Sequence, residues 1–129
     1  MSLNYRSIGL DGEPWPAWVR ELKGKSGVYV IKSHGSDGDV LYVGSSAGKL
    51  YDTIARHFQR WHRTKNFWKG LRGAHHDPGI VYSRSRCCVA IEFTSKGAHF
   101  EREAELIQRL KPRDNLVLNP AGDETPFRR

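Results

Sequence analysis

The chain has 129 residues, of which 38% are hydrophobic and 27% are charged. This length suits one domain, and we predict a single domain over residues 1–129. The balance of apolar and charged residues can bury a core, which excludes a disordered tail or a collagen-like fibre. Lys and Arg number 21 against 14 Asp and Glu, and the resulting net charge of +7 favours an anionic partner.

The sequence lacks the patterns of membrane insertion and secretion. No apolar run approaches the roughly 18 to 20 residues that cross a bilayer, and residues 1–10 do not resemble a secretory signal. The two cysteines, Cys87 and Cys88, are neighbours and cannot join distant segments through a disulfide. We therefore expect no membrane partner and a reducing, cytoplasmic setting.

The first half of the chain predicts a short helix followed by a β-hairpin. Pro14 and Pro16 favour a helix that starts near them and covers residues 17–22. Residues 27–32 (GVYVIK) and 40–43 (VLYV) are rich in β-branched and aromatic side chains, and turn-forming residues separate them. We expect these two segments to pair as antiparallel strands.

The second half predicts two further helical regions and one more strand. Apolar residues from Leu50 to Trp61 recur at spacings of four, four and three, which indicates an amphipathic helix over residues 49–63. A second helical piece is expected over residues 65–71. Residues 81–93 contain strand-like sequence, most clearly 88–93, and residues 98–110 form the clearest helix, which Pro112 ends.

This order of elements predicts an α+β fold. The expected architecture is a small antiparallel sheet of about three strands, flanked by helices. Residues 117–129 are predicted to form a tail. The sequence has no repeats and no low-complexity tract, so the functional residues are expected to lie on this one small sheet and its helices.

The positive charge is concentrated in residues 45–75. This segment has seven basic residues against the single acid Asp52, so it carries six of the seven net charges, and Trp61, Phe67 and Trp68 are interleaved with them. Phosphates attract such charges, and unstacked bases stack on such aromatics, so nucleic acid is the expected partner. A merely solvated basic helix face is the alternative. The basic residues are Lys49, Arg56, Arg60, Arg63, Lys65, Lys69 and Arg72.

Glu103 falls on the apolar side of the last predicted helix. At about 100° per residue, Phe100, Ala104, Ile107 and Leu110 form one stripe that includes Glu103. Burying a carboxylate costs free energy unless a cation or a metal ion compensates it. Glu103 is therefore expected to bind a metal ion, to pair with an arginine at the edge of the core, or to meet water there.

The helix predicted over residues 49–63 has a basic flank. Thr53, Arg56, Arg60 and Arg63 share one side of it, and His57 lies between that side and the core. Arginines three and four residues apart can follow a row of phosphates. A histidine at the edge of the core either carries a proton in catalysis or makes a structural hydrogen bond.

Taken together, these features resemble the GIY-YIG nuclease domain. Residues 27–29 (GVY) and 42–44 (YVG) are similar to the two signature triplets of that family. The pattern E..LI...KPR.N in residues 103–115 is similar to the sequence around the family's metal-binding glutamate and its later asparagine. The resemblance covers residues 26–116 and implies a metal-dependent endonuclease that hydrolyses phosphodiester bonds in DNA.

The resemblance also implies roles for individual residues. Glu103 would hold one Mg²⁺ or Mn²⁺ ion, His57 would belong to the catalytic group, and Asn115 would order the site through hydrogen bonds. Tyr29 or Tyr42 would act as the base or orient the attacking water, and the sequence leaves open which of them does so. A base role at neutral pH requires the tyrosine pKa to fall by about three units from its usual value near 10.

One position departs from the family pattern. The family has an arginine four residues before its helix histidine, and counting back from His57 gives Thr53. Arg56 and Arg60, one and two turns along the same flank, are the candidates to replace it. If neither does, the alternative function is a non-catalytic nucleic-acid-binding module on the same fold. A homodimer or an accessory protein would be a source of specificity.

Two other motifs are weaker. Residues 44–50 (GSSAGKL) follow a strand as a phosphate-binding loop does, but the glycines are one residue too close and Leu50 replaces the Ser or Thr that binds magnesium. The neighbouring cysteines and His75 and His76 suggest zinc, but adjacent residues on a strand point to opposite faces. We expect neither nucleotide hydrolysis nor structural zinc.

Overall fold

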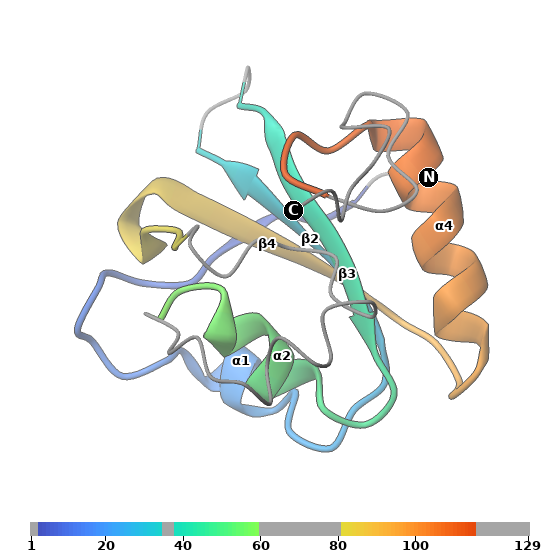
Figure 1. Cartoon of the computed structure of the whole chain (residues 1–129). Coiled ribbons are helices and arrows are strands. Elements are labelled where there is room, and N and C mark those ends of the chain that lie inside the picture. The colour runs from blue at the N-terminus through green and yellow to red at the C-terminus, as the bar shows by residue number, and fades with distance from the viewer. Residues whose placement is uncertain (1–2, 35–37, 60–80, 116–129) are drawn as a thin grey trace, which may run out of the picture.

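The computed structural model describes residues 3–34, 38–59 and 81–115 (Figure 1). The helical piece predicted over 65–71 and the tail predicted over 117–129 lie outside these residues. In chain order, the elements are β1 (Arg6–Ser7), α1 (Ala17–Arg20), β2 (Gly27–Ser33), β3 (Val40–Ser46), α2 (Leu50–Arg56), the 3₁₀ turn η2 (Arg84–Arg86), β4 (Cys87–Phe93) and α4 (Ala98–Leu110).

A single antiparallel sheet forms the centre of the fold. Its strand order is β1-β4-β2-β3, so β2 lies between the hairpin partner β3 and the later strand β4. The register places Tyr29 opposite Gly44 on β3 and opposite Ile91 on β4. The α+β class and the hairpin are confirmed. The expected count of about three strands is one too few, because β1 is only two polar residues long and has no apolar alternation to reveal it.

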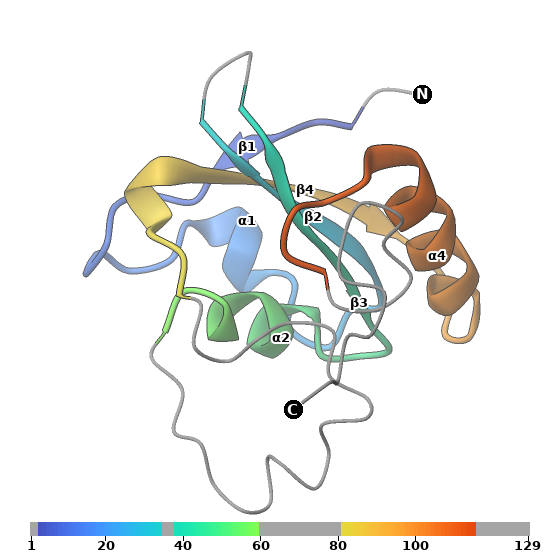
Figure 2. The same cartoon turned by 45° about the horizontal axis from the view of Figure 1, so that its top comes forward.

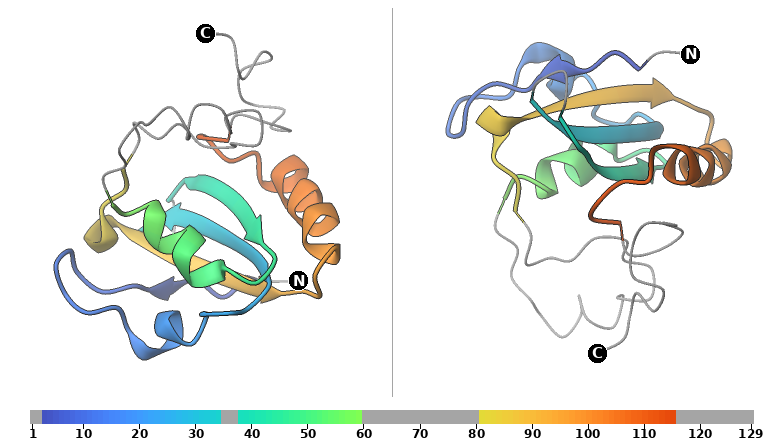
Figure 3. Two further views of the ribbon diagram at one scale, coloured as in Figure 1. Left: turned by 60° about the horizontal axis from the view of Figure 1, so that its bottom comes forward. Right: turned by 90° about the horizontal axis from the view of Figure 1, so that it is seen from above.

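Helices cover the two faces of this sheet. Figure 2 shows α1 and α2 on one side of the strands, and Figure 3 shows the β2–β3 hairpin between α2 and α4. Side chains alternate along a strand, so Tyr29 and Ile31 join the core beneath α2, whereas Val28 and Val30 pack against α4. The core on the α2 side holds the buried aromatic residues, and the two hairpin tyrosines are among them.

Helix α4 begins and ends at the predicted residues, but it is rotated, so the face that it buries differs from the predicted face. Its buried side chains are His99, Glu103, Leu106 and Ile107, whereas Phe100 is 66% exposed. Phe100 was expected to start the apolar stripe, and that prediction is wrong. His99 takes the inward position instead, because its Nδ1 accepts a hydrogen bond from the backbone N–H that precedes the helix. This rotation brings Glu103 toward the middle of the buried side.

The helix predicted over residues 49–63 is shorter than expected. Helix α2 ends at Arg56, and the backbone N–H groups of His57, Phe58 and Gln59 each donate to the carbonyl three residues earlier. The α-helical spacing therefore ends after Arg56, and the part of the basic flank predicted beyond residue 59 lies outside the described residues. None of the described helices has the length and hydropathy needed to cross a bilayer.

Arg84 anchors the N-terminal segment to the rest of the domain. Its Nε and one terminal nitrogen donate to the Ile8 carbonyl at 3.2 and 2.8 Å, and the other terminal nitrogen donates to the Glu13 carbonyl at 2.6 Å. The guanidinium carbon lies 4.0 Å from the centre of the Trp15 ring. Only 6% of the residue is exposed, so these hydrogen bonds replace the water that burial removes.

Replacing Arg84 with alanine is expected to lower the free energy of unfolding by about 2 to 4 kcal/mol, because buried carbonyls lose charged donors. Urea denaturation measures this loss. Arg86→Ala is the matched control, since Arg86 belongs to the same 3₁₀ turn and is exposed; it should change the free energy by less than about 0.5 kcal/mol. Equal losses in the two variants would contradict the anchoring role.

Candidate functional site

A buried hydrogen bond joins Tyr29 and His57. The Tyr29 hydroxyl oxygen and His57 Nε2 are 2.7 Å apart, and both residues are almost completely buried. Tyr29 comes from β2, whereas His57 comes from the turn that follows α2. With a proton on Nδ1, the imidazole accepts from the tyrosine hydroxyl at Nε2; with a proton on Nε2, it donates. Two predicted catalytic residues are therefore in direct contact.

Two further tyrosines surround the imidazole. The centre of the Tyr42 ring lies 4.6 Å from that of His57 and 6.1 Å from that of Tyr29. On another side, the Tyr82 ring is stacked on His57 at 6.1 Å with an angle of 27° between the planes. His57 is thus held among three phenol rings, which restricts its orientation.

Tyr82 was not predicted, and a carboxylate fixes its position. Its hydroxyl donates to Asp114 Oδ2 at 2.8 Å. The Arg113 guanidinium donates to both oxygens of Asp114 at 2.9 Å, which balances the negative charge. In the sequence, Asp114 lies between Arg113 and Asn115, which both belong to the C-terminal pattern of the resemblance. This position was the signal that could have marked Asp114 as a site residue. For Tyr82 there was no comparable signal, because it precedes β4 in irregular chain.

Gly44 allows the Tyr29 ring to lie across β3. A Cβ atom at position 44 would collide with the hydroxyl of Tyr29 and contact the Tyr42 ring closely. The third position of the second triplet therefore has a steric reason to be glycine. The spacing between the triplets and the pairing of β2 with β3 together put this glycine beneath the tyrosine of the first triplet.

Asn115 holds the outer edge of β3. Its Oδ1 accepts the Val43 N–H at 2.9 Å, and its Nδ2 donates to the Val43 carbonyl at 2.8 Å. The side-chain amide thus pairs with the edge strand as another strand would. Val43 lies between Tyr42 and Gly44, so Asn115 fixes the backbone from which both project.

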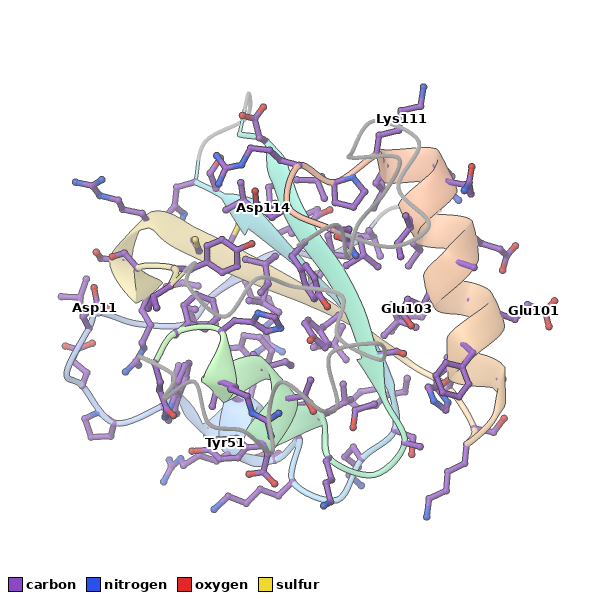
Figure 4. All side chains as sticks on the ribbon, viewed as in Figure 1. Asp11, Tyr51, Glu101, Glu103, Lys111 and Asp114 are labelled. Atoms are coloured by element: carbon purple, nitrogen blue, oxygen red, sulfur yellow. The ribbon has the colours of Figure 1, made fainter. Side chains whose placement is uncertain are left out.

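Glu103 reaches the same strand from α4. It is only 4% exposed, and its Oε1 accepts a hydrogen bond from the Ser45 hydroxyl at 2.7 Å. Figure 4 shows Glu103 directed from α4 toward β3, whereas Glu101 points away from the sheet. The predicted partners were a metal ion, an arginine or water, and the partner seen among the described residues is instead the neutral hydroxyl of Ser45. Ser45 was missed, because a serine after a strand carries no distinctive signal.

An ion pair sets the rotation of α4 beside Glu103. Arg102 Nε and NH2 donate to the two oxygens of Glu92 on β4, at 2.6 and 3.0 Å. This bidentate pair fixes the helix against the sheet at the residue that directly precedes Glu103. The direction of the Glu103 side chain is therefore constrained from two elements, β3 and β4.

Burial raises the pKa of the tyrosines at this site. It is the largest cause for both Tyr29 and Tyr42, and the negative charge of Glu103 raises the pKa of each further. The positive charge of Arg56 lowers the pKa of Tyr29 by a smaller amount. Both side chains are therefore neutral phenols near pH 7. The groups of residues 3–34, 38–59 and 81–115 on balance raise these pKa values and do not supply the fall that a base role requires.

Two of the predicted nucleic-acid-binding and phosphate-binding residues lie within the described chain. Lys49 directly precedes α2, Arg56 is its last residue, and both are exposed. Arg56 is near enough to Tyr29 for its charge to affect that pKa. The other five basic residues lie outside the described ranges: Arg60, Arg63, Lys65, Lys69 and Arg72.

The oxygen ligands at this site suit a hard cation. Residues 3–34, 38–59 and 81–115 contain no group of three or more His, Cys, Asp and Glu placed to hold a metal ion. Glu103 supplies a carboxylate and Ser45 a hydroxyl. Mg²⁺ and Mn²⁺ accept few protein ligands when water and phosphate oxygens complete their coordination, so this donor set fits them.

Comparison with protein-family models, with curated proteins and with solved structures finds no match for this chain.

Tyr29→Phe is expected to show how the raised pKa contributes to stability. The native state holds this proton more tightly than the unfolded chain does. The contribution of Tyr29 to the free energy of unfolding is therefore complete below the usual pKa of 10, and it is lost as pH rises above that value. At pH 8 the variant should be less stable by about 1 to 2 kcal/mol, because the hydrogen bond is lost. Above pH 10 this difference should shrink by about 1.4 kcal/mol per pH unit.

Urea denaturation of both proteins between pH 8 and about pH 11 measures this effect. The two proteins serve as controls for each other, since all other titrating groups are shared. A difference that stays constant across this range would contradict the raised pKa.

Proposed function

We propose that this protein is a metal-dependent endonuclease that hydrolyses phosphodiester bonds in DNA. One observation supports this proposal above others: Tyr29, Tyr42 and His57 are in mutual contact beside β3, and Glu103, bonded to the same strand through Ser45, is near enough for its charge to raise the pKa of both tyrosines. A sheet of this size needs no buried polar side chains for packing, and burying them costs free energy. Their gathering in the order that the GIY-YIG resemblance implies therefore favours a shared chemical role.

The hydrogen bond between Tyr29 and His57 suggests how the base works. Hydrolysis requires that a water lose a proton as it attacks phosphorus. A neutral phenol accepts that proton only if its own proton leaves, and His57 Nε2 lies 2.7 Å away to receive it. In this scheme Tyr29 relays the proton, and the imidazole of His57 is the final acceptor at Nε2.

Two positive charges would stabilise the phosphate in the transition state. Glu103 and Ser45 would hold one Mg²⁺ or Mn²⁺ ion, which supplies positive charge to the phosphate oxygens when bound. Arg56 would act in place of the arginine that the family has four residues before its histidine. Its position at the end of α2, exposed and electrostatically coupled to Tyr29, supports this choice.

A second candidate function is a nucleic-acid-binding module that does not cut. The burial of the site favours it: Tyr29 is 1% exposed, His57 3% and Glu103 4%. A phosphate reaches these groups only if the atoms that cover them are displaced. In this alternative the buried polar groups stabilise the fold, and the exposed Arg56 and Lys49 bind the backbone of the nucleic acid.

The same proposal includes a reducing, cytoplasmic setting and a source of sequence specificity. Cys87 and Cys88 are both buried free thiols, and burial raises the pKa of Cys87 to about 11, so it stays protonated. Such thiols suit the reducing cytoplasm. Sequence specificity would come from this domain, from a homodimer or from an accessory protein.

Glu103→Gln is expected to abolish the nicking of supercoiled plasmid in the presence of Mg²⁺ or Mn²⁺. The amide keeps the shape of the side chain but loses the charge that would hold the ion. Agarose gels of plasmid incubated with and without metal measure the nicking. Glu101→Gln is the matched control, because Glu101 is an exposed glutamate on the same helix, and it should nick at the wild-type rate. Metal-dependent nicking that survives in Glu103→Gln would overturn the assignment.

Arg56→Ala separates the two candidate functions. If Arg56 stabilises the transition state, the variant should lose about 100-fold or more in cleavage rate and less than about fivefold in DNA affinity. Gel shifts give the affinity, and Arg60→Ala provides a comparison at the other candidate position. A wild-type plasmid that shifts on the gel but is never nicked would favour the binding module.

A further inference from the structure

A cavity lies at the opposite side of the domain from the edge strand β3. It has a volume of about 550 Å³ and lies between β1, α1 and the end of β4 (these elements are labelled in Figure 2). The residues that decide its chemistry are Arg6, Trp18, Glu21, Lys25 and Phe93. None of them belongs to the proposed catalytic group, so the cavity needs its own explanation.

One wall of this cavity is a fixed pair of a cation and an aromatic ring. The guanidinium carbon of Arg6 lies 4.5 Å from the centre of the Trp18 ring. The indole Nε1–H of Trp18 donates to the Ser7 carbonyl at 3.1 Å, which holds the ring in place. Arg6 and Ser7 are the two residues of β1, so pairing of this short strand with β4 positions the whole wall.

The aromatic side chain at the end of β4 is exposed without a packing reason. Phe93 is 61% exposed, although the strand residues before it are largely buried. An exposed phenylalanine that lines the same cavity as an indole offers a flat apolar surface on which another ring can stack. Stacking of nucleobases on such side chains tolerates any base, because each base has a π face.

The charges around the cavity favour an anion with a polar ring. Arg6 and Lys25 are basic and Glu21 is the single acid among the residues that line it, so the balance is positive. Guanidinium and ammonium groups bind phosphate through charged hydrogen bonds. The Glu21 carboxylate and the amide of Asn4, which also lines the cavity, can pair with the amino and carbonyl groups of a base edge.

We propose that this cavity binds one unpaired nucleotide, with its base beside Trp18 and Phe93 and its phosphate near Arg6 and Lys25. The volume lies within the roughly 300 to 1,000 Å³ typical of small-molecule pockets. The nucleotide could be free or part of a single strand, since both present the same base and phosphate. The proposal requires neither a metal ion nor cleavage, so it stands apart from the nuclease assignment.

The Trp18 indole N–H gives a local signal for this binding. In two-dimensional NMR spectra of the ¹⁵N-labelled full chain, Trp18→Phe identifies the Trp18 peak among those of the tryptophans. Titration with AMP and with a short oligo(dA), without divalent metal, is expected to shift that peak. Arg6→Ala and Phe93→Ala should each weaken binding at this signal by about tenfold or more.

Matched controls exist for both substitutions. Arg86 is an exposed arginine at the other end of β4, and Phe100 is an exposed phenylalanine on α4. Neither lines the cavity, so Arg86→Ala and Phe100→Ala should bind as the wild type does. Because all four altered side chains are exposed, the variants should stay folded, and their unfolding curves check this.

The outcomes separate the sources of the nucleotide and can overturn the proposal. Tighter binding of oligo(dA) than of AMP at the Trp18 peak supports a single strand, and similar affinities support a free nucleotide. The proposal is overturned if neither titrant moves the peak, if the controls weaken binding as much as the cavity variants, or if inorganic phosphate binds as well as AMP. Plasmid nicking by the wild-type protein, measured separately, reports on the nuclease proposal alone.

Discussion

The arrangement of the candidate site depends on the 2.7 Å hydrogen bond between Tyr29 and His57. It links β2 to the turn after α2 between two almost completely buried side chains, each of which would be costly to bury alone. The surrounding features maintain it. Gly44 leaves room for the Tyr29 ring, the Tyr42 and Tyr82 rings confine the imidazole, and the pair of Tyr82 with Asp114 holds one of those rings in place.

Burial of this polar cluster affects both the stability of the native state and the access of a substrate to the site. Burial keeps the tyrosines protonated and the hydrogen bonds strong, which favours a rigid native state. The same burial separates Glu103 and His57 from any phosphate outside. A nuclease on this scaffold must therefore spend part of its substrate-binding energy on uncovering the site, whereas a binding module can leave the cluster closed and use only its exposed cations.

The sequence predicted the parts of the fold that follow from local periodicity. The bounds of α4, the β2–β3 hairpin and the strand ending at Phe93 all follow from patterns of neighbouring side chains. It failed where tertiary packing decides: His99 displaces Phe100 from the core, α2 ends at Arg56, and β1 is defined only by its pairing with β4. At the site, Tyr82 and Ser45 were missed, because contacts made across the fold leave no local pattern.

The contact between Asn115 and Val43 spans 72 positions of the chain. During synthesis, both the hairpin and His57 emerge from the ribosome long before Asn115. The outer edge of β3 then lacks the amide that pairs with it, and its exposed backbone groups can join another strand. The site is therefore completed last, when the segment after α4 docks. This delay leaves the edge of the newly made hairpin open to wrong pairing until Asn115 reaches it.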